Sequence, residues 1–150
     1  MFSTIETVGG EDPPLDDLQE DIESAVLFEG VTPLPKHVFN GCSKMSSAKI
    51  PKSVTSIGYE AFSCYNLRSI TIPDSSEAIG NATFPEGKFA SIKIPRSVVS
   101  FGRNPFSRCS YLNVNVSVNP NFVLVDRILF NIEMTQIIFV QILNRATSPS

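Results

Sequence analysis

The chain has 150 residues, of which 42% are apolar, and this length and composition predict one domain with its own core. Its net charge is only −3, but nine of the fifteen acidic residues lie at or before Glu29, in a stretch without Lys or Arg. Residues 1–14 lack the basic start and apolar run of a secretory signal, and we expect no membrane insertion within this chain. Three cysteines, an odd number, argue against a disulfide framework.

Residues 1–26 are predicted to form an acidic arm followed by an amphipathic helix. Between Leu15 and Val26 the apolar residues recur at helical spacing, and acidic residues occupy the opposite face. Such a helix would cover the apolar end of the domain that follows, or bind a partner through its acidic side. We expect the first function, that of an N-terminal capping helix.

Residues 27–116 contain an internal repeat. The dipeptides Ile50-Pro51, Ile72-Pro73 and Ile94-Pro95 are 22 residues apart, and residues 27–49 fill the same positions one unit upstream. A period of about 20–25 residues indicates a solenoid, in which each unit is too small to bury its own apolar side and stacks on its neighbours. The sequence therefore predicts four stacked units over 27–116.

Each unit is expected to begin with a short strand that ends at the isoleucine before the proline. The strands would lie parallel on one face of the solenoid, and turns with short helical or 3₁₀ segments, such as residues 58–63, would form the other. Gly58, Gly80 and Gly102 would allow a sharp turn in each unit. Alternation along the strands points one set of side chains outward, as the candidate binding face. These residues are Ser47, Lys49, Ser69, Thr71, Ser91, Lys93, Asn113 and Asn115.

Residues 117–143 are predicted to be a strand-rich hairpin segment, and residues 144–150 a flexible tail. The stretches 122–125, 128–130 and 136–143 are rich in β-branched and aromatic residues, which favours a hairpin and one further strand. No repeat follows to cover the apolar residues of 137–143. We therefore expect that the chain is one end of a longer protein, or that it is truncated.

The repeats resemble a known family. The pattern Ile-Pro-x-Ser-Val-Thr-Ser-Ile-Gly-x-x-Ala-Phe at 50–62, followed by Cys64 and Leu67, is similar to the BspA-like leucine-rich repeats. The resemblance implies a repeat solenoid of the leucine-rich-repeat type. It also implies a cell-surface, adhesin-like protein whose partner is a protein of the host matrix or of a microbial surface, as in anaerobic bacteria and parasitic protists.

Catalytic and metal sites find little support in the sequence. The only histidine, His37, occupies a position that carries Glu60 in the next repeat, which indicates a surface residue. Cys42, Cys64 and Cys109 recur near one position of the repeat, which favours buried packing thiols over a metal site; a disulfide between Cys42 and Cys64 is the alternative. We expect no cofactor, no metal and no enzymatic activity.

Nucleic-acid binding is also disfavoured, because the basic residues are dispersed and the aromatic residues occupy core positions. Two N-glycosylation motifs, at Asn81 and Asn115, matter only if the chain is exported. The sequence thus indicates a non-enzymatic protein-interaction module, with an intracellular scaffold or a truncated non-functional paralogue as alternatives. It leaves the ligand, the compartment and the oligomeric state open.

Overall fold

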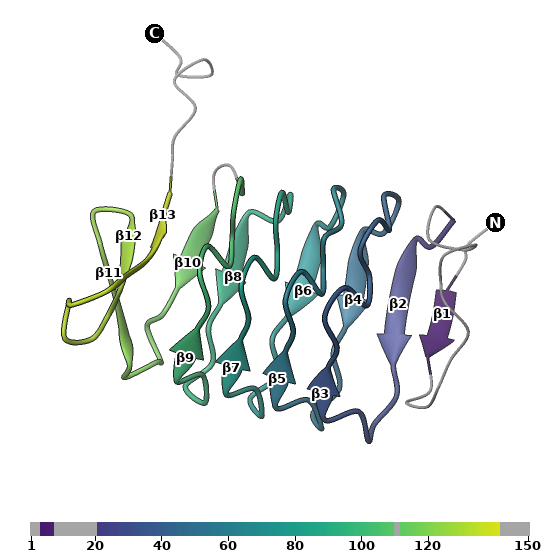
Figure 1. The fold of residues 1–150 in the computed structure, drawn as a ribbon, viewed down its shortest axis with the longest axis horizontal. Coiled ribbons are helices and arrows are strands. Elements are labelled where there is room, and N and C mark those ends of the chain that lie inside the picture. The colour runs from purple at the N-terminus through teal and green to yellow at the C-terminus, as the bar shows by residue number, and fades with distance from the viewer. Residues whose placement is uncertain (1–3, 8–20, 110–111, 142–150) are drawn as a thin grey trace, which may run out of the picture.

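The fold is a β-solenoid whose coils stack along one axis (Figure 1). It is known from a computed structural model that describes residues 4–7, 21–109 and 112–141. Within these ranges the structure contains strands and turns but no helix. The strands are β1 Thr4–Thr7, β2 Ser24–Leu27, β3 Pro33–Leu34, β4 Ser47–Lys49, β5 Ser56–Ile57, β6 Ser69–Thr71, β7 Ala78–Ile79, β8 Ser91–Lys93, β9 Ser100–Phe101, β10 Asn113–Asn115, β11 Phe122–Val125, β12 Ile128–Asn131 and β13 Ile137–Val140.

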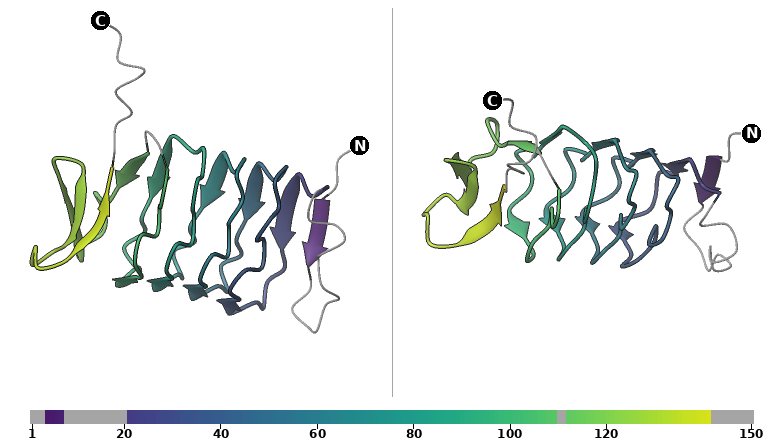
Figure 2. Two further views of the ribbon diagram at one scale, coloured as in Figure 1. Left: turned by 45° about the horizontal axis from the view of Figure 1, so that its top comes forward. Right: turned by 90° about the horizontal axis from the view of Figure 1, so that it is seen from above.

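Two rows of parallel strands run along the solenoid, as Figure 2 shows from two further sides. The first row contains the sheet β1-β2-β4-β6 and then the pair β8-β10, and the second contains the sheet β3-β5-β7-β9. Partners lie one repeat apart, as in Ser47 opposite Ser69 and Ile57 opposite Ile79. The predicted parallel strands are thus confirmed, whereas the second row was missed by the sequence interpretation.

The prediction of an N-terminal capping helix is wrong for the part that the structure describes, residues 21–26. Residues 24–27 form β2, which pairs in parallel with β4, and the side chains of Ala25 and Leu27 are buried while Val26 is exposed. This is the alternation of a strand rather than the period of a helix. The parallel ladder with β4 satisfies the backbone N–H and C=O groups of these residues. An isolated helix of about 12 residues would be only marginally stable. The first half of the predicted helix, residues 15–20, lies outside the described residues.

The predicted helical or 3₁₀ segments are also replaced, by isolated turns. Glu60, Ala82 and Asn104 each have a positive φ, of 48°, 45° and 48°, and a left-handed residue interrupts a right-handed helix. The backbone instead bonds to the next coil, as in the N–H of Phe62 with the carbonyl of Thr83 at 3.0 Å. Hydrogen bonds between coils therefore continue through the turns.

A column of stacked phenylalanine rings runs through the apolar core. Phe39, Phe62, Phe84 and Phe106 are each 0% exposed, and successive centroids lie 5.3, 5.5 and 5.8 Å apart. Offset stacks at this distance add to the stabilisation that burial itself provides. Each coil therefore supplies one ring to a continuous core.

The last three strands form an antiparallel sheet in the order β11-β12-β13. Phe139 of β13 is 7% exposed and meets Phe106 edge to face at 5.4 Å, and Ile138 is also buried. The expectation that residues 137–143 lack a cover is thus corrected for these two side chains, because the sheet folds back on the last coil. Ile137 and Val140, at the two ends of β13, are exposed.

Candidate protein-binding face

The eight candidate residues lie on four strands of the first row, two on each. They belong to β4, β6, β8 and β10, and all are exposed except Ser47, which is half-buried. Between them, Ala48, Ile92 and Val114 are buried and Ile70 is half-buried, because successive side chains of a strand point to opposite sides.

Parallel register stacks these residues into two columns. Lys49 lies opposite Thr71, and Lys93 lies opposite Asn115. Strands β6 and β8 are neighbours but form no regular hydrogen-bonded ladder. Just before the two strands begin, the backbone N–H of Lys88 donates to the carbonyl of Leu67 at 2.7 Å. The face is therefore one surface made of two hydrogen-bonded halves.

A groove of about 1020 Å³ runs over three successive coils of this face. Its lining joins the outward residues of β4, β6 and β8 to the turns that follow these strands. The residues that line it are Glu29, Ala48, Lys49, Ile50, Pro51, Lys52, Ser69, Ile70, Thr71, Ile72, Pro73, Asp74, Ser75, Lys93 and Pro95. A smaller cavity of about 300 Å³ lies between β9 and the last sheet, and none of the eight candidate residues lines it.

Charge in the groove is mostly positive along the strands. Lys49, Lys52 and Lys93 form no ion pair with another described residue, and Glu29 accepts a hydrogen bond from the backbone N–H of Lys52 at 3.3 Å. Asp74 is the other acid of the lining. Ammonium and hydroxyl groups on this surface offer several hydrogen-bond donors to a partner.

The sequence interpretation missed one strand of the same face. Val26 of β2 lies opposite Lys49, and Ser24 lies opposite Ser47, so β2 extends both columns by one coil. Val26 is 40% exposed and gives this end of the face an apolar side chain. The alternation of Ser24 to Leu27, 23 residues before that of β4, was the signal that could have revealed it.

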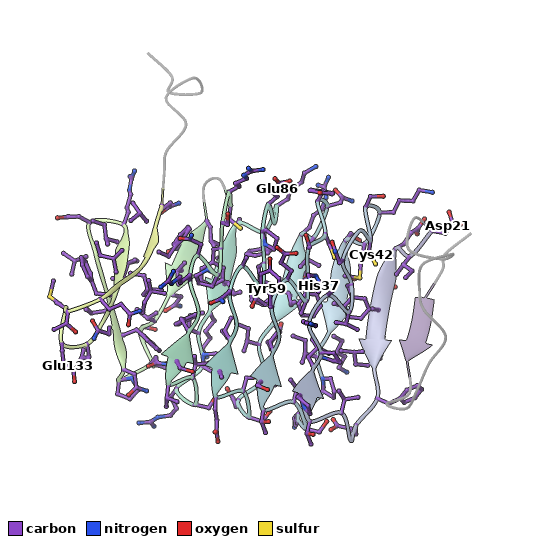
Figure 3. All side chains as sticks on the ribbon, viewed as in Figure 1. Asp21, His37, Cys42, Tyr59, Glu86 and Glu133 are labelled. Atoms are coloured by element: carbon purple, nitrogen blue, oxygen red, sulfur yellow. The ribbon has the colours of Figure 1, made fainter. Side chains whose placement is uncertain are left out.

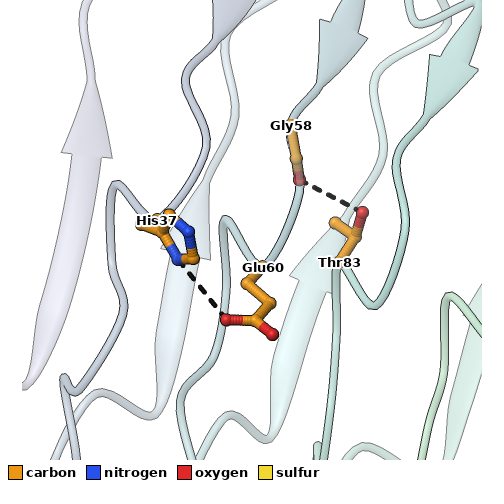
Figure 4. A network of polar contacts seen from close by, with 4 residues as sticks. All are labelled: His37, Gly58, Glu60 and Thr83. Carbon is orange, nitrogen blue, oxygen red and sulfur yellow. Dashed lines mark hydrogen bonds and ion pairs between the residues drawn. The ribbon is translucent and has the colours of Figure 1, made fainter.

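His37 lies in the turn after β3, away from the groove. Its Nδ1 is 3.4 Å from Oε2 of Glu60 (Figure 4), and its ring meets Tyr59 edge to face at 5.0 Å on the next coil (Figure 3). The histidine is exposed, as expected of a surface residue. Such a pair at the surface stabilises by about 0–1 kcal/mol.

The three cysteines are free and buried, which confirms that they are packing thiols. The thiols of Cys64 and Cys109 donate to the carbonyls of Phe39 and Phe84, at 3.1 and 3.0 Å. Hydrogen bonding with Cys42 and burial raise the pKa of Cys64, and the same hydrogen bond lowers that of Cys42. Because it is buried and its pKa is raised, the thiol of Cys64 is a poor nucleophile.

The described residues contain neither a metal-binding cluster nor a membrane-spanning helix. No group of three or more His, Cys, Asp or Glu side chains there could hold a metal ion. In the same part of the chain, no helix is long and apolar enough to cross a membrane.

The repeat geometry agrees with a family model. The model of the BspA type leucine rich repeat region matches residues 18–140 in six copies. The chain belongs to the BspA-type leucine-rich repeat family. The match begins before β2 and ends at β13, so it also covers the coil of β2 and the last sheet. Repeats of this type are typically protein-interaction modules rather than enzymes.

Solved structures share the fold. A leucine rich repeat protein of T. pallidum is 28% identical with a TM-score of 0.60, over 63% of this chain and 45% of that one. One from Bacteroides ovatus is 25% identical with a TM-score of 0.63, over 79% of this chain and 34% of its own. A leucine rich cell surface protein of Faecalibacterium prausnitzii is 22% identical with a TM-score of 0.56, over 75% of this chain and 37% of its own. At this identity the likeness supports the fold alone.

The chain spans less than half the length of each of these three structures. No curated protein matches it.

Proposed function

We propose that this BspA-type leucine-rich repeat protein is a non-enzymatic module that binds a protein through the outward side of β4, β6, β8 and β10. The observation that carries the proposal is the groove of about 1020 Å³ over the first three of these strands. Stacked repeats present an extended surface, and a groove on it lets a partner contact several coils at once. Lys49, Thr71 and Lys93 would then make the polar contacts.

The partner we propose is a protein of a host matrix or of a microbial surface, so that the chain acts in adhesion. This follows from the resemblance of its repeats to the BspA-like family. The surface fits such a role, because outward hydroxyl, amide and ammonium groups replace one another between coils while the buried positions stay apolar. Ligand choice can thus change without a change in the core.

The test is titration of the folded chain with immobilised fibronectin, laminin and collagen. We expect at least one to bind, and the Lys49→Ala/Lys93→Ala variant to bind about tenfold or more weakly, which corresponds to roughly 1.4 kcal/mol. The matched control is Lys36→Ala/Arg103→Ala. It removes the same charge from exposed residues beside β3 and β9, away from the groove, and should bind like the parent.

Two results would contradict the proposal. Absence of binding to any of the three proteins would reject the matrix partner. Equal binding by the parent and the Lys49→Ala/Lys93→Ala variant would reject the proposed binding face. The melting temperature of the variant is the folding control: if it is unchanged, a loss of binding does not come from unfolding.

A second candidate function is that of an intracellular scaffold. The observation that favours it is the set of three free thiols, since reducing compartments keep cysteines unpaired. Labelling of intact cells with a reagent that does not cross the membrane separates the two proposals. Labelled protein supports adhesion, and protein that is labelled only after lysis supports the scaffold.

A further inference from the structure

The two N-glycosylation motifs lie in very different surroundings. Asn81-Ala82-Thr83 follows β7, in the turn that packs against the next coil, and Asn115-Val116-Ser117 begins at the last residue of β10. Both have the Asn-x-Ser/Thr sequence that an oligosaccharyltransferase requires. Sequence alone does not distinguish them.

The motif at Asn81 is closed by contacts between coils. The side-chain oxygen of Asn81 accepts a hydrogen bond from the backbone N–H of Arg103 at 2.7 Å. Thr83 is 0% exposed, and its hydroxyl lies 2.8 Å from the carbonyl of Gly80 and 3.3 Å from that of Gly58 (Figure 4). Asn81 itself is exposed, but a transferase that must also contact the buried hydroxyl of Thr83 cannot reach it without opening the coils.

The motif at Asn115 is open. Both Asn115 and Ser117 are exposed, and the backbone N–H of Ser117 donates to the side-chain oxygen of Asn115 at 3.0 Å. This bond bends the motif into a turn that leaves the Asn115 Nδ2 without a hydrogen-bond partner among the described residues. β10 is also the edge strand of its sheet, so no further strand of that sheet covers the motif.

We propose that Asn115 is an N-glycosylation acceptor of the folded protein and that Asn81 is not. In the reaction, Nδ2 of Asn115 forms a bond to the anomeric carbon of an oligosaccharide carried on a polyprenyl pyrophosphate. The bond from that carbon to the pyrophosphate oxygen breaks, the polyprenyl pyrophosphate leaves with the electron pair, and the amide proton passes to a base of the transferase.

A glycan at this position would stand on the candidate binding face. Asn115 lies opposite Lys93 in the ladder between β10 and β8, so the sugar would sit one coil from a proposed contact. A glycan there would narrow the binding face proposed above from four strands to β4, β6 and β8, where the groove lies. The acceptor site itself does not depend on the binding proposal.

The test presents the purified folded chain to an oligosaccharyltransferase with a lipid-linked oligosaccharide, followed by intact-mass and peptide mass spectrometry. We expect one glycan, on Asn115. Asn115→Gln and Ser117→Ala should abolish it, whereas Ser117→Thr, which keeps the hydroxyl, and Asn81→Gln should retain it. Transfer to Asn81 of the folded chain, or no transfer to Asn115, would overturn the proposal.

Synthetic peptides that contain each motif separate the effect of the fold from that of the sequence. Both peptides should be modified, because in a peptide neither hydroxyl is buried. A peptide around Asn115 that resists transfer would contradict the proposal. A peptide around Asn81 that resists transfer would also contradict it, because the fold would then not be what closes that motif.

Discussion

At Gly58 the neighbouring coil leaves no room for a side chain. A Cβ there would lie 2.6 Å from the backbone nitrogen of Lys36 and 2.7 Å from the carbonyl oxygen of Leu34. At Gly80 the corresponding closest distances are 3.0 Å. The glycines are therefore required by close approach between coils, and the positive φ expected of a sharp turn is found two residues later, at Glu60 and Ala82.

Gly58→Ala should lower the free energy of unfolding by about 2–3 kcal/mol, because backbone atoms of the next coil must shift to admit the methyl group. Gly80→Ala should cost about 1 kcal/mol, since its neighbours need to move less. Urea unfolding of both variants measures the difference. Equal losses at the two positions would show that inter-coil spacing is not the cause.

Burial raises the pKa of the Cys109 thiol to about 11, from 9.0. Above pH 9 the thiol ionises in the unfolded chain but stays neutral in the folded one, so its contribution to stability is complete below pH 9 and is lost as the pH rises towards 11. Two pH units correspond to about 2–3 kcal/mol.

Cys109→Ala should therefore lose about 2–3 kcal/mol less stability than the parent between about pH 9 and 11. Urea unfolding of both proteins at pH 8, 9, 10 and 11 measures this. The other titrating groups, Cys64 included, contribute equally to the pH dependence of both proteins, so the difference between the two curves comes from Cys109. Parallel stability curves would indicate that Cys109 is accessible to water in the folded state.

Among the elements, the junction between the last coil and the β11–β13 sheet depends on Asn119. This residue is 6% exposed, and its Nδ2 donates to the carbonyls of Pro95 and Val98 at 2.7 and 2.9 Å. Its Oδ1 accepts the backbone N–H of Asn121 at 2.7 Å. Earlier coils use serine for the same purpose, as in Ser97, which donates to the carbonyl of Ser76 at 2.7 Å.

Asn119→Ala should lower the free energy of unfolding by about 2–3 kcal/mol, because it removes these bonds and leaves buried carbonyls with fewer donors. Asn113→Ala, on the exposed side of β10, is the matched control and should change it by less than about 0.5 kcal/mol. Thermal and urea unfolding compare the two. A similar small effect at both positions would mean that the junction is held by apolar packing alone.

Across the whole molecule, each coil contacts only its neighbours, so local stability depends on position along the axis. Interior coils have a partner on both sides, as Phe62 does between Phe39 and Phe84. In a solenoid the stability is approximately a sum of repeat and interface contributions. Coils near an end should therefore open more readily than those in the middle.

Hydrogen exchange followed by mass spectrometry should show the slowest exchange in residues 56–72 and 78–94. Residues 33–34, whose strand β3 has a parallel partner on one side only, and residues 122–140, beyond the last coil, should exchange faster, because each borders fewer coils. Equal protection along the whole chain would instead indicate a single cooperative unit.

Much of this architecture could be predicted from the period of the sequence. The prolines 22 residues apart fix the repeat, and alternation around Ile50, Ile72 and Ile94 gives the buried side of each strand correctly. The candidate face follows from the same alternation, and its eight residues do lie together on neighbouring strands. What they bind remains a proposal.

The second row of strands could not be predicted in this way. Its members, such as Ser56–Ile57, are two residues long, too short for any alternation to be visible. They are strands only because the coil above and below supplies a hydrogen-bonding partner. The groove likewise depends on how the side chains and turns of separate coils meet.

The sequence by itself determined that the chain stacks repeats and which apolar side chains of the first row of strands are buried, because apolar residues must be removed from water at every period. The tertiary structure alone decided that residues 56–57 are a strand of a second row and that Thr83 is closed while Ser117 is open. In both cases the reason is the adjacent coil, whose backbone pairs with β5 and whose atoms bury the Thr83 hydroxyl.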